Sequence, residues 1–170
     1  ELHERLPKVR LHIMGGVDDE EYGAECHALV ETLGVRDLIF TGRVNVVEYM
    51  EKLDFTILTS ISEGQPLSVL ESLAARRPCV TTEVGCCREL LEGAPGDDFG
   101  VAGFVTPPMY RKGLADAMER MCTSRARRIE MGERGQRRVA TYFLHEQMLA
   151  NYRALYDETA QAFDLPREGE

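Results

Sequence analysis

The sequence lacks any long hydrophobic run. Across its 170 residues, no stretch approaches the ~18 consecutive apolar residues of a membrane-spanning helix, and the opening ELHERLPK has no apolar core of a secretory signal. Positive charge is also scarce, because 29 acidic against 20 basic residues give a net charge of −9. This excess of acid disfavours nucleic acid and anionic lipid as partners. Any phosphate bound here must meet localised cations or backbone N–H groups.

Cysteine and histidine patterns that would indicate a disulfide framework or a metal site are missing as well. The five cysteines form no C-x-x-C, and the adjacent Cys86 and Cys87 are poorly placed to bridge each other. Because the number of cysteines is odd and no paired spacing occurs, the sequence favours free thiols in a reducing, cytoplasmic setting. The four histidines are scattered without the spacing of metal ligands, so we expect no metal site.

What the sequence does contain is an alternation of short β-branched or aromatic runs with helical patterns. Hydrophobic content of 44% is ordinary for a globular protein, and no repeat, linker or second domain boundary is visible. We therefore interpret residues 1–163 as one domain and 164–170 as a frayed tail. Strands are predicted at 9–14, 38–42, 55–59, 78–82 and 104–105, with helices near 22–33, 46–53, from 66 onward, and at 85–91, 111–122, 125–142 and 144–163.

This order of elements indicates an α/β fold with a parallel sheet flanked by helices. Ligands bind such sheets at the carboxyl ends of the strands. Four loops follow predicted strands and should converge there. They are Gly15-Gly16, Gly42 to Val44, Ser60 to Pro66 and Thr82 to Gly85.

The stretch LTSISEGQPLSVLE holds the most informative of these loops. A strand leads into a polar loop and then a helix, and Pro66 suits the first helical position because it lacks an N–H. A helix that begins in this way is an anion site. Glu63 lies in the loop and Glu71 inside the helix, so a diphosphate at the helix start would have one acid beside each flanking group. That arrangement suits a sugar nucleotide.

Simpler explanations exist for each of these features. Two acids near a helix start are favoured by the helix dipole alone, and turn chemistry accounts for the glycines of the first two loops as well as ligand contact does. Their place at strand ends favours the functional interpretation of Glu63 and Glu71. Glycoside hydrolysis by this acid pair fits less well, since the helix start favours an anion. We interpret His12 as a satisfied sheet residue, and Arg76 and Arg77 as solvated.

The helix after Pro66 should present two distinct faces. Its predicted apolar face comprises Leu67, Val69, Leu70, Leu73 and Ala74, and its polar face comprises Ser68, Glu71 and Ser72. Aromatic and aliphatic residues also recur at helical spacing between Tyr142 and Tyr156. They would belong to the core or to an interface.

The motif SEGQPLSVLE, followed by a strand and EVG, resembles the E-x7-E signature of retaining glycosyltransferases of family 4, which have the GT-B fold. More narrowly, TSISEGQPLSVLE, CRELLEG and VTPP look like the branch of the Pel exopolysaccharide glycosyltransferases, PelF. The resemblance implies the C-terminal, Rossmann-like half of a GT-B fold that binds a UDP-sugar, either UDP-glucose or a UDP-N-acetylhexosamine.

Site residues follow from the resemblance position by position. Glu63 would be the catalytic acid that contacts the donor sugar, and Glu71 would hold the ribose. Backbone N–H groups of Gln65, Leu67 and Ser68 would meet the sugar and the diphosphate. Backbone around Arg43 and Val44 would frame the base, with Gly15 and Gly16 nearby in the donor site. The resemblance implies transfer with retention and without metal or other cofactor.

The resemblance also implies parts that this chain does not contain. The family's first strand, with an Arg and a Lys that clamp the diphosphate, precedes the residues present here, as does the domain that binds the polysaccharide or glycan acceptor. We therefore expect a sheet that lacks its normally central first strand, and no turnover by this chain alone. The implied setting is exopolysaccharide synthesis, in a membrane-associated synthase complex.

A second class of function fits the same residues. A non-catalytic α/β module could bind a nucleotide or a partner protein with the same loops. A receiver-like phosphoacceptor domain is a weaker version, because Asp18 and Asp19 follow the first strand but no lysine follows a late one. The behaviour of Glu71 separates the two classes, since only a donor site requires its carboxylate.

Overall fold

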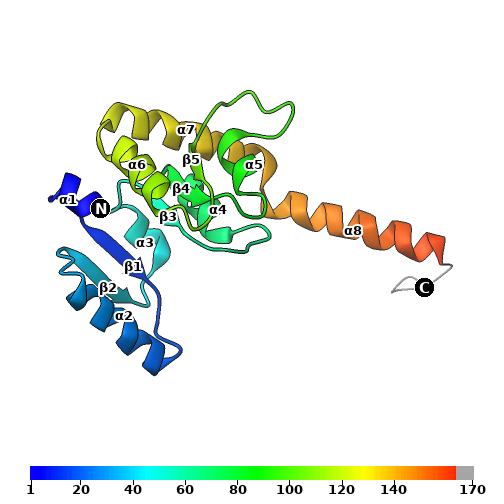
Figure 1. The fold of residues 1–170 in the computed structure, drawn as a ribbon. Helices are drawn as coiled ribbons and strands as arrows, with labels where there is room; N and C mark the ends of the chain where they lie inside the picture. Colours follow the sequence, from blue (N-terminus) through cyan, green and yellow to red (C-terminus); the bar gives the residue numbers. More distant parts are fainter. Residues whose placement is uncertain (164–170) are drawn as a thin grey trace.

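A computed structural model describes residues 1–163; the predicted tail at 164–170 lies outside this range. Strands and helices alternate as the sequence indicates (Figure 1). In chain order the elements are α1 (Leu2–Arg5), β1 (Leu11–Met14), α2 (Glu20–Thr32), β2 (Leu38–Gly42), α3 (Val46–Met50), β3 (Thr56–Leu58), α4 (Leu67–Ala74), β4 (Cys79–Thr82), α5 (Cys87–Glu92), β5 (Gly103–Thr106), α6 (Arg111–Cys122), α7 (Arg125–Tyr142) and α8 (His145–Ala162).

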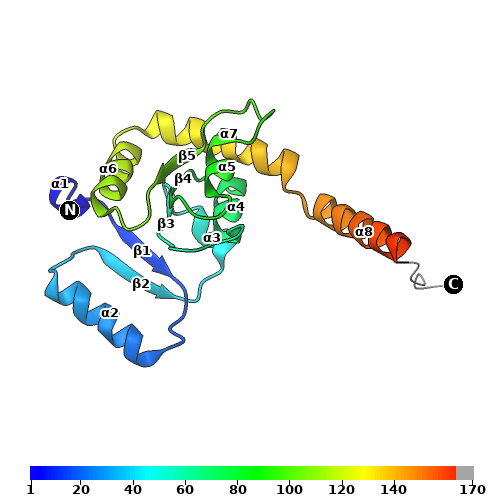
Figure 2. The same ribbon diagram turned by 45° about the vertical axis from the view of Figure 1, so that its right-hand side comes forward.

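The strands form two parallel sheets, which agrees with the predicted α/β class. One sheet contains β1 and β2, and the other has the order β3-β4-β5. Figure 2 shows β1 and β2, with α2 against them, as a layer beside the larger body. No strand of the first sheet pairs with a strand of the second among the described residues.

A groove of about 550 Å³ lies between the two sheets. Its walls include residues of both strands, such as His12 of β1 and Ile57 of β3, and α6 and α7 contribute Met118 and Arg128. The inner edges of β1 and β3 are paired with no strand among the described residues. β1 and β3 are therefore both edge strands, and both contribute residues to the walls of this groove.

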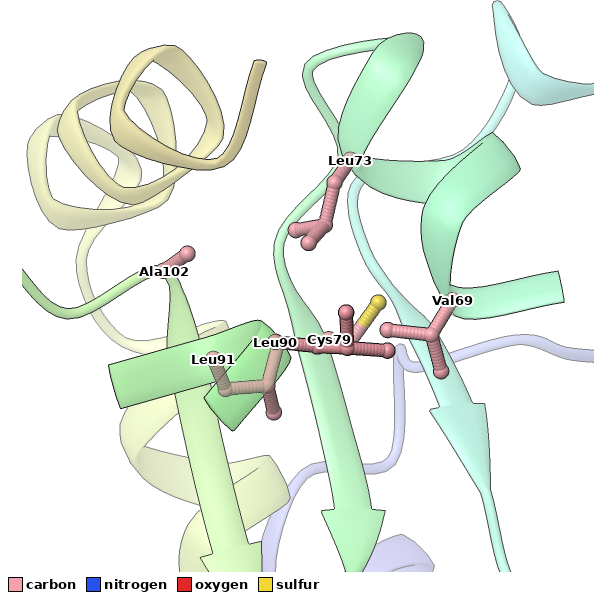
Figure 3. Packing of buried hydrophobic residues seen from close by; sticks show 6 residues of the cluster. All are labelled: Val69, Leu73, Cys79, Leu90, Leu91 and Ala102. Atoms are coloured by element: carbon pink, nitrogen blue, oxygen red, sulfur yellow. The ribbon is translucent and has the colours of Figure 1, made fainter. Parts of the chain in front are cut away.

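The hydrophobic core is built on both faces of β4, whose four residues are all buried. Because side chains alternate along a strand, Cys79 faces one layer and Val80 the other. On the Cys79 side, Val69 and Leu73 of α4 pack with Leu90 and Leu91 of α5 and with Ala102 (Figure 3). On the Val80 side, the partners are Ala117 and Met121 of α6 and Met131 of α7.

The predicted faces of α4 are wrong at Ser72 and Leu67. Ser72, predicted on the polar face, is fully buried, because its hydroxyl donates to the Arg77 carbonyl oxygen at 2.9 Å and lies 2.7 Å from the Thr56 hydroxyl. Leu67, predicted on the apolar face, is 68% exposed. In α2 no residue is buried, since this helix covers only the two-stranded sheet.

The structure confirms several other predictions and corrects one, that of Arg77. Helices α6 and α7 have the predicted bounds, and β2 does too. His12 is satisfied as expected, with Nδ1 2.6 Å from the Tyr49 hydroxyl. Arg77 is not merely solvated, because its Nε donates to the Met50 carbonyl oxygen at 2.9 Å. All five cysteines are free.

Helix α8 extends away from the body in both views (Figures 1 and 2), and none of its residues is buried. Its aromatic side chains therefore do not belong to the core, which excludes one of the two interpretations of this segment. Phe143, just before α8, does pack on the core. Among residues 1–163, no helix is long and apolar enough to cross a membrane.

A buried ion pair joins α7 to the glycine-rich loop before β5. Arg138 is 1% exposed on its side chain, and its guanidinium contacts Asp97, whose side chain is 4% exposed, at 2.5 Å. The same guanidinium donates to the carbonyl oxygens of Leu90, Leu91 and Gly100. It thus supplies donors to carbonyl groups at the end of α5, which have no partner within that helix.

We predict that Arg138→Met lowers the free energy of unfolding by about 3–5 kcal/mol, because Asp97 would remain buried without its partner. Urea denaturation at pH 7 measures the loss. The control is Arg137→Met on the exposed neighbour, expected to change stability by less than ~0.5 kcal/mol. Equal losses in the two variants would contradict the assignment.

The same pair predicts a pH dependence. Hydrogen bonds from Arg138 hold the pKa of the Asp97 carboxyl below its ordinary value of 3.8. The stabilisation is therefore complete above that ordinary value and is lost as the pH falls through the lower folded-state pKa. Denaturation curves recorded from pH 6 downward should show the gap between wild type and Arg138→Met narrowing at the acidic end. A gap that widens there would have the wrong sign.

Candidate functional site

The candidate site lies where β3 ends and α4 begins. Pro66 is the N-cap of α4 rather than its first helical residue, one position from the prediction, with φ −71° and ψ 114°. It is buried, has no N–H to leave without a partner, and turns the chain from the extended loop into the helix. Gly64 and Gln65 before it are exposed, so the loop faces solvent.

Backbone donors are available at the start of α4. Among the described residues, the N–H groups of Leu67 and Ser68 donate to no acceptor, while those of Val69 and Leu70 reach the Pro66 carbonyl oxygen. The first turn of α4 contains no acid. By contrast, α2 begins with Glu20 and Glu21, and Asp19 caps it by accepting from the Tyr22 N–H. The start of α4 is therefore open to an anion, and that of α2 is not.

Glu63 is partly buried, and one oxygen of its carboxylate is held. The Ser60 hydroxyl donates to Glu63 Oε1 at 2.8 Å. Ser60 is itself attached to β4, because the Thr82 hydroxyl donates to the Ser60 carbonyl oxygen at 2.5 Å. The acid at the strand end is thus connected to the central strand of the sheet.

The turn after β4 supports the other side of Glu63. The Cys86 N–H donates to the Gly64 carbonyl oxygen at 2.9 Å. Gly85 has φ 50°, and a methyl group there would overlap the carbonyl oxygens of Glu63 and Gly64. Burial raises the pKa of the Cys86 thiol, which keeps this neighbour of the loop neutral.

Glu71 is exposed in the second turn of α4. In the part of the chain that the structure describes, its carboxylate takes part in no hydrogen bond or ion pair. Glu71 and the N–H groups of Leu67 and Ser68 belong to the same helix, so an anion at its start would have this carboxylate one turn away. Both predicted acids therefore remain accessible around one helix start.

The four predicted loops meet in two pairs. Ser60 to Pro66 contacts Thr82 to Gly85, as described above. Gly15 contacts Gly42 through its N–H, which donates to the Gly42 carbonyl oxygen at 3.0 Å, and Gly16 lies against the Arg43 side chain. Val44 follows in the same loop and is partly buried. Within residues 1–163, no hydrogen bond or ion pair joins one pair to the other across the groove.

Arg43 is the one cation among the predicted site residues. Its side chain is 84% exposed and reaches Asp18 at 3.4 Å, so the pair is weakly held at the surface. Among the described residues, no group of three or more His, Cys, Asp and Glu side chains could hold a metal ion.

Sequence reasoning missed two contributors to the site, the hydroxyls of Ser60 and Thr82. The sequence indicates Thr82 and Ser60 only as the first residues of two loops at strand ends. A serine three residues before an acid is too common to indicate a hydrogen bond, and the contact between Thr82 and Ser60 spans 22 positions. No local pattern signals such a pairing.

Comparisons with known proteins agree on one family and one fold. Residues 1–124 match the family described as Glycosyl transferases group 1. N-acetyl-alpha-D-glucosaminyl L-malate synthase of Bacillus anthracis is 28% identical over 130 residues, which are 75% of this chain and 32% of that protein. The chain thus spans about a third of that relative's length.

Solved structures extend the likeness to nearly the whole chain. Sucrose-phosphate synthase of Thermosynechococcus elongatus superimposes on 95% of this chain and 41% of its own, with a TM-score of 0.82 and 21% identity. Anabaena HepE, in a complex with UDP and glucose, covers 90% of this chain and 42% of its own, with a TM-score of 0.77 and 22% identity. At these identities the likeness shows a shared fold.

We predict that Gly85→Ala destabilises the protein by ~1–3 kcal/mol more than Gly96→Ala does, because its methyl group must displace backbone. Gly96 is a matched control with φ 91° and nothing within 4 Å of the added carbon. Urea denaturation gives the two stabilities, and amide chemical shifts of Gly64 and Cys86 report movement of the loop. Equal stabilities with unmoved shifts would contradict the contact.

Proposed function

Because this chain belongs to the group 1 glycosyl transferases and has the Rossmann-like fold of the C-terminal GT-B domain, we propose that it is the donor-binding domain of a retaining transferase that uses a UDP-sugar. The observation that carries the proposal is the start of α4. Its free N–H groups, with Glu63 on one side and Glu71 on the other, suit a diphosphate between a sugar and a ribose. The UDP and glucose bound by Anabaena HepE support this donor class.

Each site residue has a role in this proposal. The diphosphate lies at the N–H groups of Leu67 and Ser68, with Gln65 contributing its N–H to the sugar side. Glu71 accepts hydrogen bonds from the ribose hydroxyls. Glu63 accepts them from the donor sugar and lies nearest the reacting carbon. It is the catalytic residue of the site.

The second pair of loops completes the donor site in this proposal. Backbone around Arg43 and Val44 frames the base. Gly15 and Gly16 lie beside this loop, where the absence of side chains lets a ligand approach the backbone. The groove between β1 and β3 separates the base from the diphosphate.

Transfer with retention proceeds on one face of the sugar. An oxygen of the acceptor forms a bond to the anomeric carbon on the face from which the diphosphate departs. The bond from that carbon to the diphosphate oxygen breaks, and the acceptor's proton passes to the departing diphosphate. Charge develops on that diphosphate, where the N–H groups of α4 stabilise it. The proposal requires no metal ion or other cofactor.

The remaining parts of the proposal concern the whole protein. The matched residues cover only 32–42% of the relatives described above, so the polysaccharide or glycan acceptor would be bound by a domain outside this chain. The 170 residues alone would then turn over no substrate. The likeness of TSISEGQPLSVLE to PelF supports a role in cytoplasmic exopolysaccharide synthesis, within a membrane-associated synthase complex.

A non-catalytic α/β module remains the rival function. The same helix start could hold a nucleotide, and the exposed face of α8 could hold a protein. The rival needs no role for Glu71, which a surface position alone would explain. A donor site needs its carboxylate.

We predict that Glu71→Gln weakens UDP binding by about 5- to 150-fold, since charge-assisted hydrogen bonds contribute ~1–3 kcal/mol. Calorimetric titration with UDP, then UDP-glucose and UDP-N-acetylglucosamine, measures the effect in the 170-residue chain and in the full-length polypeptide. The control is Glu158→Gln on the exposed α8, which should leave binding unchanged. Equal affinities of wild type and Glu71→Gln in the full-length polypeptide would favour the non-catalytic module.

A further inference from the structure

We propose that the hydroxyl groups of Ser60 and Thr82 position the Glu63 carboxylate for the donor sugar, an inference that rests on the proposed function. Neither residue touches the ligand in this proposal. Both are positioning residues that act through Glu63.

The first contact divides the two oxygens of the carboxylate. Oε1 accepts from the Ser60 hydroxyl at 2.8 Å, whereas Oε2 has no hydrogen-bond partner among the described residues. Glu63 precedes a glycine in an exposed loop, and without Ser60 its side chain would sample several rotamers. Fixing a glutamate side chain costs rotamer entropy, and here that cost is met before a ligand arrives. Oε2 is left as the acceptor for a sugar hydroxyl.

The second contact gives Ser60 a rigid support. Thr82 is 5% exposed at the end of β4, the strand that is buried on both faces. Its hydroxyl donates to the Ser60 carbonyl oxygen at 2.5 Å. On the other side of Glu63, the Cys86 N–H holds the Gly64 carbonyl oxygen. The loop is thus anchored to β4 and its turn both before and after the acid.

A neighbouring threonine provides a matched control. Thr106 is 6% exposed at the end of β5, and its hydroxyl donates to the Thr81 carbonyl oxygen at 3.3 Å. It has the same side chain, similar burial and the same kind of bond as Thr82. Its acceptor is the residue before Thr82 in β4, and the Thr106 hydroxyl has no hydrogen bond to Ser60 or Glu63 among the described residues. Replacing Thr106 by Val therefore measures the loss of such a bond without disturbing Glu63.

The test compares affinities for UDP and for the UDP-sugar in the full-length polypeptide, by calorimetry. Of UDP-glucose and UDP-N-acetylglucosamine, the test uses the one whose affinity exceeds that of UDP by the larger factor. Ser60→Ala and Thr82→Val should each lower the affinity for the UDP-sugar by about fivefold, which corresponds to the net contribution of one hydrogen bond. The affinity for UDP should stay within about twofold of the wild-type value. Ser60→Thr and Thr82→Ser retain the hydroxyl, so the ratio of the affinity for the UDP-sugar to that for UDP should equal the wild-type ratio. Thr106→Val should leave the ratio unchanged.

Glu63→Gln separates failure of this inference from failure of the proposed function. One outcome is that Glu63→Gln reduces the ratio of the affinity for the UDP-sugar to that for UDP while Ser60→Ala leaves this ratio unchanged. In that case the donor site stands and the positioning role is overturned. A Ser60→Ala loss equal for UDP and UDP-sugar also overturns it, because a general loss of structure acts on both ligands. If Glu63→Gln itself leaves the ratio unchanged, the assignment of Glu63 to the sugar fails, and the inference fails with it.

Discussion

The structure depends on a single strand that is buried on both faces. Each residue of β4 is covered, so the strand tolerates only compact neighbours above and below it. Cys79 brings α4 and α5 to one face, and Val80 brings α6 and α7 to the other. The same strand ends at Thr82 and the turn that supports the Glu63 loop. Packing and site geometry therefore share one element, and a disturbance of the core reaches the site through it.

The chemistry of the site combines the effect of a helix start with that of two carboxylates. A helix start without acids of its own attracts an anion, and two accessible carboxylates beside it accept hydrogen bonds from hydroxyl groups. A ligand that is anionic in the middle and rich in hydroxyls at both ends satisfies both. The excess of negative charge over the whole chain makes this local arrangement necessary, since the net field repels phosphate.

Much of the fold could be predicted because its periodic patterns are strong. The bounds of α6 and α7 follow from their helical patterns, and β2 is enclosed by turns. Predictions of burial succeeded less well. Ser72 is buried because the Thr56 hydroxyl and the Arg77 carbonyl oxygen, both outside α4, satisfy its hydroxyl. Neither partner is visible in the local sequence.

The sequence by itself determined the alternation of elements, the strand-to-helix loop with Pro66, and the two acids with seven residues between them, because all of these are local patterns. Only the tertiary structure decided which oxygen of Glu63 is held, that Gly85 packs on the loop, and that Arg138 is buried against Asp97. Those contacts join residues from different elements. Their energy depends on how two distant segments are oriented after the core has packed, which spacing along the chain does not encode.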